Sequence, residues 1–211
     1  SGGGVVVRVG ELTLNNVTVS DNTAEYDGGG IFVDDALTLN RTIVSGNSAA
    51  SGDEVYVYSG TYGSGTATAN NFNLFGHSGI TNAAAFENFT PGATDITATS
   101  DGTEPTALSA ILAALADTGG PTTPATQTPA LDPGSPAIDR APNAACSAAP
   151  VNGVDQRDEA RNVDGDGAAS ADECDVGAYE APFVAPPSIC PAPGNELTTI
   201  LGVGMGSPKK A

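Results

Sequence analysis

The chain has 211 residues and a formal net charge of −18, with 27 glycines and 15 prolines but no tryptophan. Such a composition disfavours a helical bundle or a doubly wound α/β sheet and favours short strands joined by tight turns. So acidic a surface repels nucleic acid and anionic membrane leaflets, and no apolar run is long enough to span a membrane directly.

The N-terminal part of the chain repeats itself. Residues 12–22 (LTLNNVTVSDN) match residues 37–47 (LTLNRTIVSGN), a glycine triplet precedes each copy, and a third, degraded copy runs through residues 52–74. Apolar and polar residues alternate within each copy, which predicts short strands with one apolar face. A unit this small cannot bury that face alone, whereas stacked copies bury a continuous apolar column.

Two architectures fit this alternation, an antiparallel hairpin series or sandwich and a right-handed parallel β-helix. Asn15 recurs as Asn40 and Asn22 recurs as Asn47, and stacked amides can form a ladder along a column of copies. This recurrence favours an all-β, right-handed parallel β-helix of about three coils over residues 1–90. No cap precedes the first coil, so preceding coils or another chain are expected to cover its strand edges.

The remaining sequence is predicted to form an irregular C-terminal capping block, residues 91–180, and a Pro/Gly-rich tail, residues 181–211. One short amphipathic helix is expected near residues 105–117, where apolar residues recur at helical spacing between Pro105 and Gly119. A tail of this composition is expected to order only by packing on the coils or on a neighbouring chain. We therefore expect a subunit of a larger assembly.

Three cysteines are present and none has the CxxC spacing of a zinc site. Near-absence of lysine and the Gly-, Asn- and Thr-rich body suit an exported protein, in which a disulfide persists. We predict that Cys146 pairs with Cys174, which leaves Cys190 free or bonded to another chain.

Four motifs follow one another in the capping block: LADTGGPT at 115–122, PALDPGSPAID at 129–139, DQR at 155–157 and CDVGAYE at 174–180. Together they resemble the conserved tail of choice-of-anchor Q β-helix surface proteins. The upstream glycine triplets and the TIVSGN repeat are similar to those of the same proteins and of polymorphic outer-membrane proteins. The resemblance implies a secreted right-handed parallel β-helix at the cell surface, and it implies architecture and location more than activity. The chain departs from the family in its tail, which contains no recognised sorting signal.

The capping block contains a candidate calcium loop, because Asp residues alternate with glycine in the segment DGDG at 164–167. The full EF-hand pattern is absent, and the alternative is a solvated acidic turn held by the neighbouring disulfide. No other cofactor is predicted. The candidate ligands are Asp164, Asp166, Asp172, Glu173 and Asp175. Arg157 is expected to pair with a carboxylate such as Asp139 or Asp155, with an anion site as the alternative.

The coils offer no pair of facing carboxylates, and His77 is the only histidine, so we predict no catalytic residue and no enzymatic activity. The predicted function is that of an extracellular, cell-surface structural protein acting in adhesion or as a subunit of a surface assembly, with other subunits or copies of itself as partners. The alternative is a carbohydrate-binding or polysaccharide-degrading β-helix protein. Its aromatic platform for surface glycans would be Tyr56, Tyr58 and Tyr62.

Overall fold

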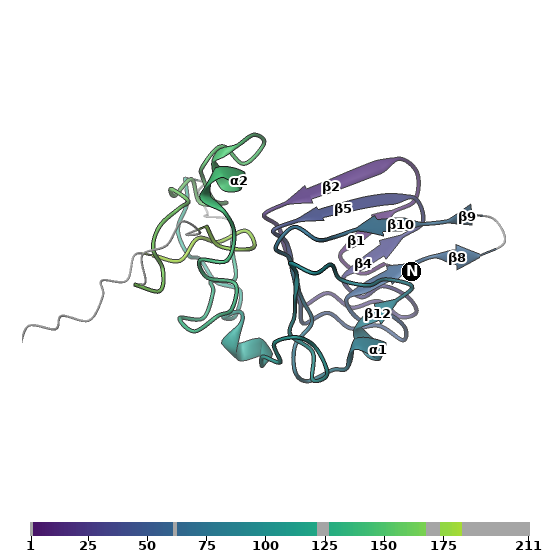
Figure 1. Ribbon diagram of the computed structural model, residues 1–211. Helices are drawn as coiled ribbons and strands as arrows, with labels where there is room; N and C mark the ends of the chain where they lie inside the picture. The colour runs from purple at the N-terminus through teal and green to yellow at the C-terminus, as the bar shows by residue number, and fades with distance from the viewer. Residues whose placement is uncertain (1, 61–62, 122–126, 168–173, 183–211) are drawn as a thin grey trace, which may run out of the picture.

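The computed structural model describes residues 2–60, 63–121, 127–167 and 174–182, and this part of the chain is mostly β (Figure 1). Its strands build three parallel sheets, named A, B and C here. Sheet A contains, in spatial order, β1 (Val5–Val7), β4 (Ile31–Val33), β7 (Val55–Val57) and β12 (Phe86–Glu87). Sheet B contains β2 (Glu11–Asn15), β5 (Ala36–Asn40) and β10 (Thr66–Thr68). Sheet C contains β3 (Thr18–Val19), β6 (Ile43–Val44), β11 (Leu74–Phe75) and β13 (Ile96–Thr97).

The chain visits sheets A, B and C in turn, and each strand pairs with the equivalent strand of the next repeat. Leu12 lies opposite Leu37, and Leu37 lies opposite Ala67. Every pairing within these sheets is parallel, so the antiparallel hairpin alternative is wrong for them. The hairpin of β8 (Ser59–Gly60) and β9 (Gly63–Ser64) is antiparallel; it is inserted into the third repeat and lies on the side away from the capping block (Figure 1).

The apolar face of each repeat points between the sheets. In the middle repeat Ile31, Val33, Leu37, Leu39 and Val44 are all buried. Alternation along a strand sends neighbouring side chains to opposite faces, which is why the period-two pattern of the sequence produces this column. A cluster of edge-to-face phenylalanine rings fills the column towards its later repeats. Its members are Phe75, Phe86 and Phe89.

The predicted asparagine ladders are present between repeats. The Asn40 amide donates to Asn15 Oδ1 at 3.0 Å, and Asn71 extends the ladder by donating to Asn40 Oδ1 at 2.7 Å. The second ladder joins Asn22 Nδ2 to Asn47 Oδ1 at 3.0 Å. These bonds tie equal positions of successive repeats together and fix their register.

The Asn40→Ala variant is expected to lose about 1–2 kcal/mol of unfolding free energy, because Asn40 both donates and accepts within its ladder. Urea denaturation measures the loss. Thr38→Ala is the matched control, since Thr38 lies on the same strand and face but outside the ladder, and it should cost less than half as much. Equal losses in the two variants would contradict a stabilising ladder.

The prediction of a helix near residues 105–117 is wrong except for a single turn. A 3₁₀ turn, η1 (Leu108–Ala110), is followed by extended backbone. The N–H of Ala113 donates to the Ala130 carbonyl at 2.8 Å and the N–H of Thr128 donates to the Ala116 carbonyl at 2.9 Å. Pairing with the segment 128–131 therefore replaces the hydrogen bonds of a helix, and Leu115, expected on the apolar face, is 55% exposed.

Two short helices were not predicted, α1 (Asn82–Ala85) before β12 and α2 (Asn143–Ser147) in the capping block. Parallel pairing also continues to Thr97, beyond residue 90 where the coils were expected to end. The capping block lies beside the stacked sheets, against the turn between sheets B and C (Figure 1). Most of the predicted tail, from residue 183 on, lies outside the described residues, and so does Cys190.

Candidate functional site

The capping block is joined to the coils through its CDVGAYE segment. Gly177 N–H donates to the Arg41 carbonyl at 2.9 Å, and Ala178 N–H donates to Thr18 Oγ1 at 3.0 Å. Gly177 has φ +97°, and a Cβ there would lie 2.7 Å from Thr18 Oγ1 and 2.8 Å from Ile43 Cδ1. Only glycine permits both this backbone conformation and this close approach to the coils.

The predicted disulfide between Cys146 and Cys174 is confirmed. The bond joins α2 to the start of the CDVGAYE segment, with a Cα–Cα distance of 6.4 Å, and both cysteines are fully buried. Ala141 and Cys174 also exchange backbone hydrogen bonds of 2.9 and 3.3 Å. The disulfide therefore anchors a segment that is already paired.

Arg157 pairs with a carboxylate, as the sequence predicted, and of the two candidates Asp139 and Asp155 it is Asp155. Its Nε and one terminal nitrogen contact Asp155 Oδ2 at 2.8 and 2.6 Å, and its guanidinium lies 3.7 Å from the centroid of the Tyr179 ring. The same terminal nitrogen donates to the Glu180 carbonyl. These contacts lock the DQR and CDVGAYE motifs together.

A second arginine, Arg161, forms a buried ion pair with Glu180 at 3.3 Å, and each side chain is 1% exposed. Arg161 also donates to the carbonyls of Val154, Asp175 and Gly177. Burial raises the pKa of Glu180, although the N–H groups and the arginine around it oppose that shift. The ion pair of Arg161 with Glu180 was not predicted. The only indication of it in the sequence was a single arginine among the acidic residues that follow the DQR motif.

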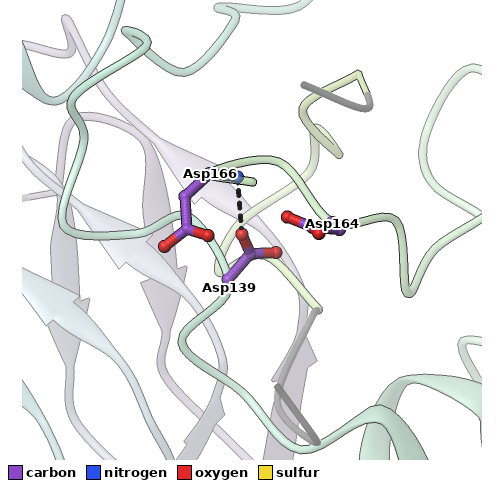
Figure 2. Close-up of side chains that lie close together, drawn as sticks. All are labelled: Asp139, Asp164 and Asp166. Atoms are coloured by element: carbon purple, nitrogen blue, oxygen red, sulfur yellow. Dashed lines mark hydrogen bonds between the residues drawn. The ribbon is translucent and has the colours of Figure 1, made fainter. Parts of the chain in front are cut away.

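Figure 2 shows the acidic group of the block, Asp139, Asp164 and Asp166, whose carboxylate oxygens lie within 4.8 Å of one another. Asp139 accepts from the N–H groups of Gly165 and Asp166 at 3.0 and 2.8 Å, and Asp164 accepts from Gly167 N–H at 2.6 Å. Burial raises the pKa of Asp139, and the neighbouring carboxylates act in the same direction. The group therefore braces the 164–167 turn.

Of the predicted calcium ligands, the structure brings Asp164 and Asp166 together and adds Asp139. Asp175 is fully buried and accepts instead from the N–H groups of Asp139 and Ala181. The predicted ligands Asp172 and Glu173 lie outside the described residues. Three carboxylates could contribute part of the six to eight oxygens that calcium takes, so calcium binding stays a prediction.

The predicted aromatic platform is brought together only in part. Tyr56 stacks on Phe32 of the preceding repeat, with ring centroids 5.4 Å apart and planes inclined by 6°. The Tyr58 ring covers Gly60 of the inserted hairpin, because a Cβ added at Gly60 would lie 2.1 Å from Tyr58 Oη. Tyr62 is outside the described residues. The contact with Phe32, which is only 6% exposed, was not predicted.

A buried carboxyl in the coils, Glu54, was also missed. It is fully buried and accepts from Gly46 N–H at 2.9 Å and from the Asn47 amide at 2.7 Å, so it ends the second asparagine ladder. Burial raises the pKa of Glu54 to about 8. Ile31 N–H donates to the Glu54 carbonyl in the same way that Val5 N–H donates to the Gly30 carbonyl, so Glu54 occupies a position that holds glycine in the preceding repeat. A glutamate at a repeated glycine position was therefore the signal available in the sequence.

Unfolding free energy is expected to fall as the pH rises from about 4.5 to about 8. The folded state holds the Glu54 proton up to about pH 8, whereas the unfolded chain releases it near the ordinary glutamate pKa of 4.5, so deprotonation favours unfolding in this window. Asp175, whose pKa burial also raises to about 8, acts in the same direction.

The Glu54→Gln variant should therefore show a shallower decline of unfolding free energy across that window than the wild type. Urea denaturation at a series of pH values measures the slope. Glu25→Gln, at an exposed position, is the matched control. Parallel curves for wild type and Glu54→Gln would contradict a buried proton at this residue.

Among the described residues, no helix has both the length and the apolar character that crossing a membrane requires. Comparisons with protein-family models, curated proteins and solved structures gave no significant match to this chain.

Proposed function

We propose that this chain is a right-handed parallel β-helix of the cell surface, a non-catalytic acidic scaffold that acts in adhesion or as a subunit of a surface assembly. The observation that carries the proposal is the stacking of equal residues from successive repeats in three parallel sheets. Stacking of this kind makes a rigid column whose length grows with each repeat and whose outer face is free for contacts.

The charges and the disulfide support an extracellular scaffold. Arg157 and Arg161 are committed to carboxylates inside the capping block, so these two cations serve the fold. The chain as a whole keeps a net charge of −18, which favours solubility and attracts cations. A buried disulfide fits an oxidising compartment. The resemblance to choice-of-anchor Q proteins supports the same location.

The location is tested by labelling intact and permeabilised producing cells with antibodies to the folded chain. Equal labelling of both is expected, and labelling confined to permeabilised cells would contradict a surface role. The non-catalytic assignment is tested by incubating the protein with a panel of neutral and acidic polysaccharides. Release of new reducing or unsaturated ends above a heat-inactivated control would overturn it.

Carbohydrate binding is the second candidate, favoured by the half-buried ring of Tyr56, which stacks on the buried ring of Phe32 on the outer side of sheet A. On a glycan array, the double variant Tyr56→Ala/Tyr58→Ala is expected to lose any binding that the wild type shows, because aromatic faces stack on sugar rings. Tyr26→Ala is the control, since Tyr26 is 61% exposed and lies outside the stack. No binding by the wild type would remove this candidate.

A further inference from the structure

A polar cleft of about 560 Å³ lies between the coils and the capping block. Small-molecule sites are typically concave, with volumes of about 300–1,000 Å³ and a few polar groups that converge on the ligand. All the lining residues lie between positions 72 and 140, away from the first repeat. Those that carry the argument are Phe72, Asp95, Thr103, Glu104, Asp139 and Arg140.

The segment that carries Thr103 and Glu104 is held against β13. Thr97 N–H donates to Thr103 Oγ1 at 3.0 Å, and the Thr97 carbonyl accepts from Glu104 N–H at 3.1 Å. Thr103 Oγ1 is thus an acceptor within the fold, and its own hydroxyl hydrogen can be donated into the cleft. Because the fold itself fixes this wall, a ligand loses little free energy in ordering it.

Arg140 supplies the cation of the cleft. Its backbone is anchored because Ala141 N–H donates to the Cys174 carbonyl at 2.9 Å. The guanidinium lies 3.9 Å from the Glu104 carboxylate, too far for a hydrogen bond, and the two side chains are 48% and 46% exposed. Within the part of the chain that the structure describes, the guanidinium makes no other ion pair or hydrogen bond. A set of donors and a set of acceptors therefore face one another with their hydrogen-bonding capacity unused.

The charges around the cleft select a neutral ligand. Asp95, Glu104 and Asp139 outnumber the single arginine, so an anionic ligand would be repelled. A cationic ligand would meet the guanidinium of Arg140. A hydroxyl group both donates and accepts, so the neighbouring hydroxyls of one ring can donate to Glu104 and accept from Arg140 at the same time. The ring of Phe72 adds an aromatic face, which attracts the C–H groups of such a ring.

We propose that this cleft binds a neutral sugar residue. Two of its hydroxyls bridge Glu104 and Arg140, a third accepts from Thr103, and its C–H face lies towards Phe72. The site goes beyond the scaffold function, because it gives the acidic column a specific contact for a glycan beside the capping block. It shares its ligand class with the second candidate function but uses none of the aromatic residues of sheet A.

A titration of the full isotope-labelled chain, followed by amide chemical shifts, tests the ligand class. The probes are the methyl glycosides of glucose, galactose and mannose, each with its matched uronate and its matched amino sugar. At least one neutral glycoside should shift the amides of Thr103, Glu104 and Arg140 saturably, with a dissociation constant of about 1 mM or below. Its uronate and its amino sugar should bind at least about tenfold more weakly.

Saturable shifts with none of the neutral glycosides would overturn the proposal. So would a uronate or an amino sugar that binds as tightly as the neutral ring, since the charges of the cleft would then not select the ligand. Saturable shifts confined to amides away from the cleft would place the site elsewhere and reject this one.

Two variants test the residues. Arg140→Met and Glu104→Met keep the length of the side chain but remove the polar groups, and each should weaken binding at least about tenfold. Both positions are half-exposed, so the variants are expected to fold, and circular dichroism melting curves check this. Glu25→Met is the matched control, because Glu25 is exposed and lies outside the cleft. Unchanged binding by both cleft variants would contradict the proposal.

The double variant Tyr56→Ala/Tyr58→Ala separates the two carbohydrate sites and should bind the neutral glycoside as the wild type does. If it loses binding while Arg140→Met keeps it, the sugar lies on sheet A; the second candidate function then stands and the cleft is rejected. Surface labelling of cells does not depend on sugar binding, so the scaffold proposal can fail or hold separately.

Discussion

Replacing Arg161 with methionine is expected to lower the unfolding free energy by about 3–5 kcal/mol, because it leaves the Glu180 carboxylate buried without its cation. Both side chains of the pair are 1% exposed, so water cannot take over from the guanidinium. The variant also releases the carbonyls of Val154 and Gly177, to which Arg161 donates. Urea denaturation followed by circular dichroism measures the loss.

A surface ion pair provides the matched control. Arg140 lies 3.9 Å from Glu104, and these side chains are 48% and 46% exposed, so Arg140→Met should cost no more than about 1 kcal/mol. The double variant Arg161→Met/Glu180→Gln should recover part of the loss, because the remaining buried group is neutral and still accepts hydrogen bonds. An Arg161→Met variant as stable as Arg140→Met would show that the buried pair does not hold the block.

The repeats could be predicted because their evidence is local and recurs. Asn15 and Asn40 occupy equal places in two copies, so their contact follows once the copies stack. The same reasoning did not find Glu54, because that position holds glycine in the earlier repeats. A single substitution in a repeat is easily taken for surface variation, and only the packing of Asn47 above it reveals that it is buried.

The capping block was harder to predict because it has no repeat. The spacing of Ile111, Leu112 and Leu115 fits one face of a helix, but the competing pairing with residues 128–131 lies more than ten residues away and leaves no periodic signal. Asp139 was likewise missed as a neighbour of Asp164, since 25 residues separate them. Contacts of this kind depend on how loops fold back, which a pattern of residue types does not encode.

Removing the disulfide should lower the unfolding free energy about as much as Arg161→Met does. The double variant Cys146→Ser/Cys174→Ser is expected to lose about 3–4 kcal/mol of unfolding free energy, because the bond closes a loop with a sequence separation of 28 and restricts the unfolded chain. Both positions are fully buried, so each new hydroxyl also needs a hydrogen-bond partner there. Both the chain with the disulfide and the double variant should carry Cys190→Ser, so that no third thiol can exchange with the pair.

Hydrogen exchange measures which part of the chain is destabilised when the disulfide is removed. The segment that carries Cys174 reaches the coils through Gly177 and Ala178, whereas the coils are held by their own ladders and apolar column. Without the disulfide, amide protection should therefore fall first at Ala141 and Val176 and persist at Leu37 and Leu39. Simultaneous loss of protection at all four residues would instead mean that the coils depend on the capping block for their stability, and the two would then be a single cooperative unit.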